Sequence, residues 1–237
     1  MAVQATVQEG WRTILARIFS LDVADVHSDI GFFKIGEGGF VNVPPKQPIA
    51  PVGTRTDLES EGAPLGSGGT ATFTNGTTAV VGVGTSFLAD VVVGQWIKPG
   101  PDFTGATVNS AGVPGSEVDE WGQVLSVTDN LNIVLSAVYA GATVGGREVR
   151  LANEPLFTFR KTLTAGEVLF NSAVPAITEI TAIVAAGEAN ADQLANPPEF
   201  FELGVFDANG VMICYVTFDQ ETKTGLVQLN HIVNLIF

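Results

Sequence analysis

Apolar residues recur at helical spacing in one stretch near the start of the chain, residues 10–20. Residues on the i, i+3, i+4, i+7 and i+8 positions share one face of a helix, and here they are Trp11, Ile14, Leu15, Ile18 and Phe19. The pattern predicts one N-terminal helix. Its apolar stripe either lies on a sheet of its own domain or docks on a neighbouring subunit, since two arginines are too few for a basic membrane-surface helix.

Apolar runs of strand length dominate the chain after residue 155. Residues 156–161 and 177–184 are candidate strands, and residues 200–206 and 211–218 flank the turn sequence 207–210. Aspartate, asparagine and glycine in that turn are typical of a hairpin.

The last run of the chain alternates between its two faces, as a strand does. One face is apolar and carries Val227, Leu229, His231, Val233, Leu235 and Phe237. The other is only half polar, because Ile232 and Ile236 interrupt Gln228, Asn230 and Asn234. A final strand that is apolar on nearly both faces is predicted to be covered on both, by its own core or by another subunit.

Residues 64–152 differ in character, being rich in threonine, valine and glycine. Short apolar runs at 70–74 and 77–81 flank Asn75-Gly76, the strongest short hairpin signal. Further runs at 94–98, 121–127 and 131–135 follow at turn spacing. The segment is predicted to be a small antiparallel sandwich or barrel, with the Gly-, Pro- and Ser-rich loop 99–119 at its tip.

Glycines and prolines interrupt residues 31–64, which are predicted to be loop-like and to cross a surface as an arm. The glycine-rich run 62–69 is predicted to be a linker. Together the patterns predict a mainly β protein: an antiparallel β-sandwich base domain, residues 1–63 plus 153–237, with one N-terminal helix and an inserted β-sandwich or barrel domain, residues 64–152.

The composition of the chain indicates that it assembles with other subunits. Apolar residues make up 46% of the 237 residues and charged residues 15%, and the mean hydropathy is +0.31. No apolar run is long enough to span a membrane, so the excess apolar surface is interpreted as subunit interface. The candidate interface residues are Trp11, Ile14, Leu15, Ile18, Ile232 and Ile236.

The net charge of the chain restricts the classes of partner that are expected. A net charge of -14 repels phosphate backbones and anionic lipid, so neither nucleic acid nor a membrane is an expected partner. The start of the chain lacks the regions of a signal peptide, which favours synthesis in a cytoplasm and retention there until assembly. The single cysteine, Cys214, allows no intramolecular disulfide.

Catalytic chemistry is sparse, and the chain is predicted not to be an enzyme and to need no cofactor or metal. No phosphate-binding glycine loop and no nucleophile elbow occur. Of the two histidines, His231 lies on an apolar strand face, where a hydrogen-bonded core residue is favoured over a base or a pH-sensing interface residue. Residues 188–192 begin like a calcium loop, but the later glycine and glutamate are missing.

Paired carboxylates leave a glycosidase open as the enzymatic alternative. The candidates are Glu117, Asp119 and Glu120 in the long loop, and Glu199 and Glu202 near the C-terminus. The loop offers nothing that would raise a carboxyl pKa, so solvated surface carboxylates are favoured there. Cys214 lies in an apolar strand and is expected to pack rather than react.

The C-terminal motifs resemble a known family. Residues 202–218, ELGVFDANGVMICYVTF, with Lys223 and the closing residues 230–237, resemble contractile-phage tail-fibre and baseplate-attachment proteins. Residues 32–40 are similar to a glycine-rich motif of other phage virion proteins, and residues 75–142 to small β modules of phage tails and capsids.

The resemblance implies a structural subunit of the virion that contacts other virion proteins and further copies of itself. Fibre proteins of this kind continue into a long shaft, whereas this chain ends at Phe237, which favours an adaptor, collar or decorating role in the tail, baseplate or neck. Two alternatives stay open: a capsid decoration protein, and a glycan-binding receptor module using Trp96, Trp121 and Tyr139.

Overall fold

The computed structural model describes residues 4–7, 30–41, 44–100, 121–164, 166–171, 177–191 and 196–236. The predicted helix at residues 10–20 and most of the predicted loop at 99–119 lie outside these residues. Within them the chain is mainly β and forms antiparallel sheets, in agreement with the coarse fold prediction.

The chain divides into two compact units, which are described separately. The first unit comprises Met1–Leu58 and Phe159–Phe237, and the second comprises Glu59–Thr158. These boundaries lie near the predicted domain boundaries at 64 and 152. Whether the second unit folds independently of the first, as the domain prediction requires, stays a prediction.

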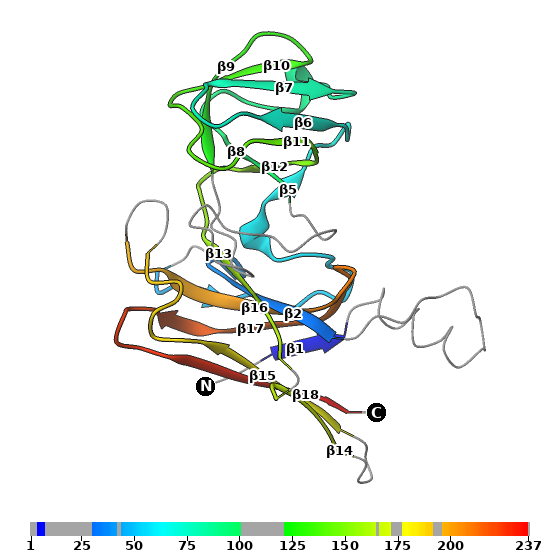
Figure 1. The fold of residues 1–237 in the computed structure, drawn as a ribbon, viewed down its shortest axis with the longest axis vertical. Helices are drawn as coiled ribbons and strands as arrows, with labels where there is room; N and C mark the ends of the chain where they lie inside the picture. Colours follow the sequence, from blue (N-terminus) through cyan, green and yellow to red (C-terminus); the bar gives the residue numbers. More distant parts are fainter. Residues whose placement is uncertain are drawn as a thin grey trace, which may run out of the picture. The chain divides into compact units, whose positions relative to one another are not determined.

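A five-stranded sheet in the order β1-β17-β16-β2-β13 forms the centre of the first unit (Figure 1). Its strands are β1 (Gln4–Val7), β2 (Ile30–Gly36), β13 (Thr158–Thr162), β16 (Glu199–Asp207) and β17 (Met212–Thr222). The middle strand β16 is buried on both faces, as its nearly continuous apolar sequence requires. The predicted hairpin turn at 207–210 joins β16 to β17, with Gly210 at φ +86°.

A second sheet of the first unit has the order β14-β15-β18. Its strands are β14 (Val168–Asn171), β15 (Ile177–Val184) and β18 (Leu229–Ile236), and the inner face of β18 reaches β17, where the Phe218 and His231 rings lie 4.5 Å apart. The short strands β3 (Phe40–Val41) and β4 (Gln47–Pro48) form a two-stranded ribbon.

The prediction that residues 31–64 are loop-like is wrong at its start. Residues 30–36 form β2, which pairs with β16 inside the sheet. Gly31 serves close packing, because a Cβ there would lie 2.7 Å from the Ala208 Cα. Gly31 therefore permits two backbones to approach within a sheet and does not mark a turn.

The second unit is one eight-stranded sheet, curled into a half-barrel, in the order β11-β6-β7-β10-β9-β8-β12-β5 (Figure 1). The strands are β5 (Ala63–Pro64), β6 (Thr70–Phe73), β7 (Ala79–Val83), β8 (Trp96–Pro99), β9 (Gly122–Val127), β10 (Asn132–Leu135), β11 (Val144–Arg147) and β12 (Val149–Ala152). A 3₁₀ turn, η1 (Glu59–Glu61), and a short helix, α2 (Phe87–Asp90), complete it.

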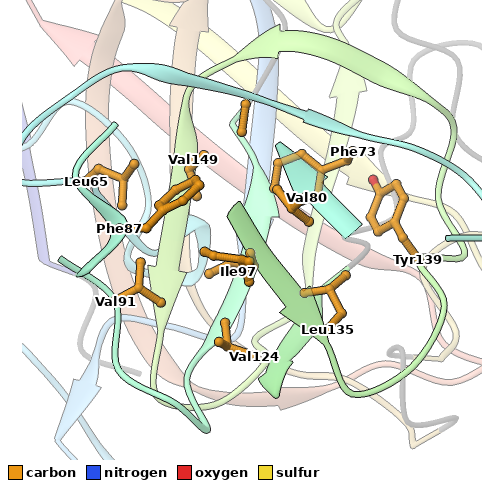
Figure 2. Packing of buried hydrophobic residues seen from close by; sticks show 12 residues of the cluster. Leu65, Phe73, Val80, Phe87, Val91, Ile97, Val124, Leu135, Tyr139 and Val149 are labelled. Carbon is orange, nitrogen blue, oxygen red and sulfur yellow. The ribbon is translucent and has the colours of Figure 1, made fainter. Parts of the chain in front are cut away.

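Alternate residues of these strands point into one apolar core, shown in Figure 2. On β7, for example, Val80 is buried while Val81 and Val83 are exposed. The core includes Leu65, so the predicted linker at 62–69 is wrong at that residue, which is part of the folded unit. Gly62 is also confined, since a Cβ there would lie 2.6 Å from the Leu151 carbonyl oxygen.

The two ends of the second unit lie side by side. Strand β12 pairs with β5, placing Arg150 opposite Pro64. Nearer the unit boundary, the Thr158 hydroxyl donates a 2.8 Å hydrogen bond to the Ser60 hydroxyl. An inserted domain has to leave and rejoin its host at neighbouring points, and this geometry meets that requirement.

Candidate assembly interface

Strands β15 and β18 of the β14-β15-β18 sheet have one covered face and one open face, because side chains alternate along each strand. The covered face does not extend over all of β14, where Phe170 pairs with Thr178 and is 70% exposed. Ile180, Ala182 and Val184 of β15 are fully buried, and most of the β18 residues that pair with that face are nearly so, namely Leu229, Val233 and Leu235. The alternation predicted for the last strand is therefore confirmed at these residues.

The open face carries apolar side chains among polar ones such as Glu179, Thr181 and Asn234. Ile232 of β18 is 62% exposed and pairs with Thr181, and Leu169 of β14 is 54% exposed and pairs with Glu179. Ile183, on the same face of β15, is partly buried. This patch, Leu169, Ile183 and Ile232, is called the outer patch below.

The structure describes only some of the six predicted interface residues. Ile232 lies in the outer patch. The backbone of Ile236 pairs with Ile177, but its side chain lies outside what the structure describes. Trp11, Ile14, Leu15 and Ile18 also lie outside the described residues. The interface role of all six stays a prediction.

The two acidic residues of segment 202–218, Glu202 and Asp207, are buried and bound internally. Glu202 accepts a 2.7 Å hydrogen bond from the Tyr215 hydroxyl, and neither residue is exposed to solvent. One carboxylate oxygen of Asp207 accepts hydrogen bonds from the main-chain N–H groups of Asn209 and Val211, at 2.9 and 2.8 Å. These carboxylates hold a hairpin in shape, which is structural chemistry.

Lys223, the lysine that follows this segment, is also buried. Its ammonium donates to the Asn190 side-chain oxygen at 2.7 Å and to the carbonyls of Ala186 and Thr224 at 3.2 and 2.9 Å. Desolvation lowers the pKa of Lys223, and the negative charge of Glu188 opposes that shift. The ammonium thus fixes the loop between β15 and β16 from inside.

That loop is the one whose sequence begins like a calcium site. Glu188 accepts a 3.0 Å hydrogen bond from Lys161, and Asn190 accepts from Lys223, so lysine ammonium groups take up these oxygen ligands. No cluster of three or more His, Cys, Asp or Glu residues suited to a metal ion occurs within the part of the chain that the structure describes.

Those of the other candidate catalytic groups that the structure describes are not assembled into a site. Glu117, Asp119 and Glu120 lie outside the described residues, Glu199 pairs with Lys46 at 3.3 Å, and Cys214 is buried. The His231 side chain is mostly buried beside Phe218, with its Nε2 atom 3.3 Å from a Glu221 oxygen. The two atoms are too poorly aligned for a hydrogen bond, although the contact suits an ion pair when the imidazole is protonated.

Two of the three aromatic residues considered for glycan binding are core residues. Tyr139 packs against Phe73 with ring centroids 5.4 Å apart, and Trp121 is 4% exposed and donates its indole N–H to the Leu156 carbonyl. A sugar stacks on exposed aromatic faces, so these two residues cannot serve as its platform in this conformation.

Two buried ion pairs were missed by sequence reasoning. Lys34 lies 3.0 Å from Asp57 in the first unit, and Lys98 lies 2.6 Å from Glu61 in the second. Each pair joins residues far apart in the chain, so no local sequence pattern could have revealed it. Asp57 and Glu61 stand on either side of the unit boundary at Leu58, and each is anchored within its own unit.

No helix among the described residues has the length and apolarity needed to cross a membrane. Comparison of the chain with protein-family models, with curated proteins and with solved structures found no match in any of the three.

Proposed function

We propose that the chain is a non-enzymatic structural subunit of a bacteriophage particle, located in the tail, baseplate or neck, where it attaches or seals other parts of the virion. The observation that carries this proposal is the segment 202–218 with Lys223, whose sequence resembles contractile-phage attachment proteins. Its polar residues Glu202, Asp207 and Lys223 are all used in internal contacts. The motif therefore serves folding, as expected for a structural subunit whose resemblance to other proteins lies in its fold and not in a catalytic site.

In this proposal the base domain is an antiparallel β-sandwich with the helix at residues 10–20, and it anchors the chain in the particle. The inserted domain projects outward. The partners are other virion proteins and further copies of the same chain, with no nucleic acid and no membrane, and the protein is made in the host cytoplasm. The outer patch supports a docking role, because isolated sheet faces in water are usually polar.

The copy number of the chain per particle tests the proposal. Phage particles would be purified from the culture that produces the chain and analysed by quantitative mass spectrometry against a major capsid protein of known copy number. A tail, baseplate or neck subunit should be present in a small multiple of the rotational symmetry of the tail. Absence of the chain from purified particles would overturn the proposal.

Two other outcomes would redirect it. A copy number comparable with that of the capsid protein would assign the chain to capsid decoration. Release of sugars from the host surface polysaccharide by the purified chain, with loss of that activity in Glu117→Gln or Glu120→Gln, would make it an enzyme instead.

A further inference from the structure

The chain contains two Asn-Gly pairs, Asn75-Gly76 and Asn209-Gly210, and both occupy exposed hairpin turns. Asn-Gly is the sequence most prone to spontaneous deamidation, because glycine has no side chain to hinder attack by its own main-chain nitrogen on the preceding side-chain amide. In the folded structure the side chains of the two asparagines are hydrogen-bonded differently, so the two pairs should deamidate at different rates.

The Asn75 amide is held in place. Its nitrogen donates to the carbonyl oxygens of Ala140 and Gly141 at 2.9 and 2.8 Å. The main-chain N–H of Asn75 donates to the Thr143 hydroxyl at 3.0 Å, and the attacking atom, the Gly76 nitrogen, donates to the Tyr139 carbonyl at 2.9 Å. The leaving group and the nucleophile are therefore both tied to the segment 139–143.

The Asn209 amide has no such restraint: the described residues make no hydrogen bond to its side chain. Only the main chain of this turn is held, through the Asn209 N–H to the Asp207 carboxylate at 2.9 Å and the Gly210 N–H to the Asp207 carbonyl at 3.1 Å. The side chain of Asn209 is exposed and can rotate towards Gly210.

We propose that Asn209 is a site of spontaneous deamidation in the folded protein and that Asn75 is protected. The Gly210 nitrogen loses its proton to solvent base and attacks the Asn209 side-chain carbonyl carbon. The carbon–nitrogen bond of the side-chain amide breaks and ammonia leaves, giving a cyclic imide. One water then opens the imide at either carbonyl, so the net reaction consumes water, releases ammonia and involves no oxidation or reduction.

Both products alter the β16–β17 hairpin. Opening at the side-chain carbonyl gives aspartate, which adds a negative charge beside the buried Asp207 carboxylate. Opening at the main-chain carbonyl gives isoaspartate, which lengthens the main chain by one carbon within a turn fixed by the Asp207 and Val211 hydrogen bonds. The modification would therefore weaken the hairpin that carries the phage-like motif.

The test compares the two sites within the same molecule. The purified full chain is incubated at mildly alkaline pH, once folded and once in denaturant, and peptides containing residues 75 and 209 are followed by mass spectrometry with isoaspartate detection. In the folded chain Asn209 should convert about tenfold faster than Asn75 or more, because two additional side-chain hydrogen bonds must break at Asn75. In denaturant the two rates should become similar.

Asn209→Gln is the matched control, since its longer side chain forms the cyclic imide far more slowly. The variant should lose the change at position 209 and keep the slow rate at Asn75. Equal rates at both sites in the folded chain would overturn the proposal. So would a folded chain that converts at neither site while the denatured chain converts at both, because the main-chain bonds alone would then protect Asn209. The outcome does not depend on the proposed function.

Discussion

At the residue scale, the charges inside this protein are the positions least tolerant of change. Removing a charge from solvent costs several kcal/mol, which is recovered only while its partner stays in place. Lys98 and Glu61 lie 2.6 Å apart, and both side chains are 3% exposed. Lys98 also lies over the Trp121 ring, 4.9 Å from its centroid.

Lys98→Met should therefore destabilise the second unit by about 3–5 kcal/mol, because it leaves the Glu61 carboxylate buried without its ammonium partner. The double variant Lys98→Met/Glu61→Leu should recover most of that loss. Urea unfolding followed by tryptophan fluorescence measures both, since Trp96 and Trp121 belong to this unit. Lys46→Met is the control: its pair with Glu199 is more than a third exposed and should contribute less than about 1 kcal/mol. Equal costs at Lys98 and Lys46 would contradict the argument.

The buried Lys223 should make the free energy of unfolding depend on pH. Because desolvation lowers its pKa in the folded state, with Glu188 opposing the shift, the folded protein releases this proton at a lower pH than the unfolded chain does. Between the two pKa values the unfolded state binds more protons, so the free energy of unfolding should rise with pH through the alkaline range. That contribution is complete above the unfolded pKa and is lost as pH falls through the folded pKa.

The effect is measured as the difference in unfolding free energy between the wild type and Lys223→Met across that pH range. The difference cancels the titration of other groups and should change in favour of the wild type as the pH rises. A difference that is independent of pH would show that the Lys223 pKa is the same in both states.

At the scale of elements, strands could be predicted where neighbouring residues alternate between apolar and polar or where a turn sequence lies beside them. Residues 177–184 were predicted and form β15 with the same limits, and the Asn75-Gly76 and Asp207–Gly210 turns connect the expected strands. Strand β2 was missed because its glycines resembled turn residues. Gly31 is required by the nearby Ala208, more than 170 residues away in the chain, and such a contact leaves no local signal.

Only part of the outer patch could be predicted from the sequence. Ile232 broke the polar pattern of its strand face and was identified as a candidate. Leu169 and Ile183 join it only through the β14-β15-β18 pairing, which depends on tertiary structure. The buried Glu202–Tyr215 hydrogen bond and the buried Lys223 ammonium could not be predicted either, because the sequence does not say which polar residues will be buried.

Ile232→Asp separates an interface role from a folding role for β18. Ile232 is 62% exposed, so the change should cost less than about 1 kcal/mol, mainly through the lower strand preference of aspartate, while reducing self-association or incorporation into particles. Val233→Asp is the matched control one residue away: Val233 is 8% exposed, and burying a carboxylate there should unfold the chain. Urea unfolding and analytical ultracentrifugation measure the two effects. Unchanged association in a folded Ile232→Asp variant would remove Ile232 from the interface.

At the scale of the whole molecule, each unit contains its own charge pair and its own apolar core. The Lys34–Asp57 pair belongs to the first unit, where the Asp57 carboxylate also accepts the Leu58 main-chain N–H at 2.9 Å. The Lys98–Glu61 pair and the core around Phe73 and Ile97 belong to the second. The chain enters and leaves the second unit at Ser60 and Thr158, whose hydroxyl groups are hydrogen-bonded.

Replacing residues 60–157 with a short Gly/Ser link should consequently leave the first unit folded, because the link need span only the gap between two adjacent points and its loop-closure cost is small. The truncated chain should unfold cooperatively in urea and show dispersed amide signals by NMR. Adding Asp57→Ala to it is the internal control: this leaves the buried Lys34 without its carboxylate and should cost about 3–5 kcal/mol. If the truncated chain is instead unfolded while retaining Asp57, the two units depend on each other for stability, and the second is not an inserted domain.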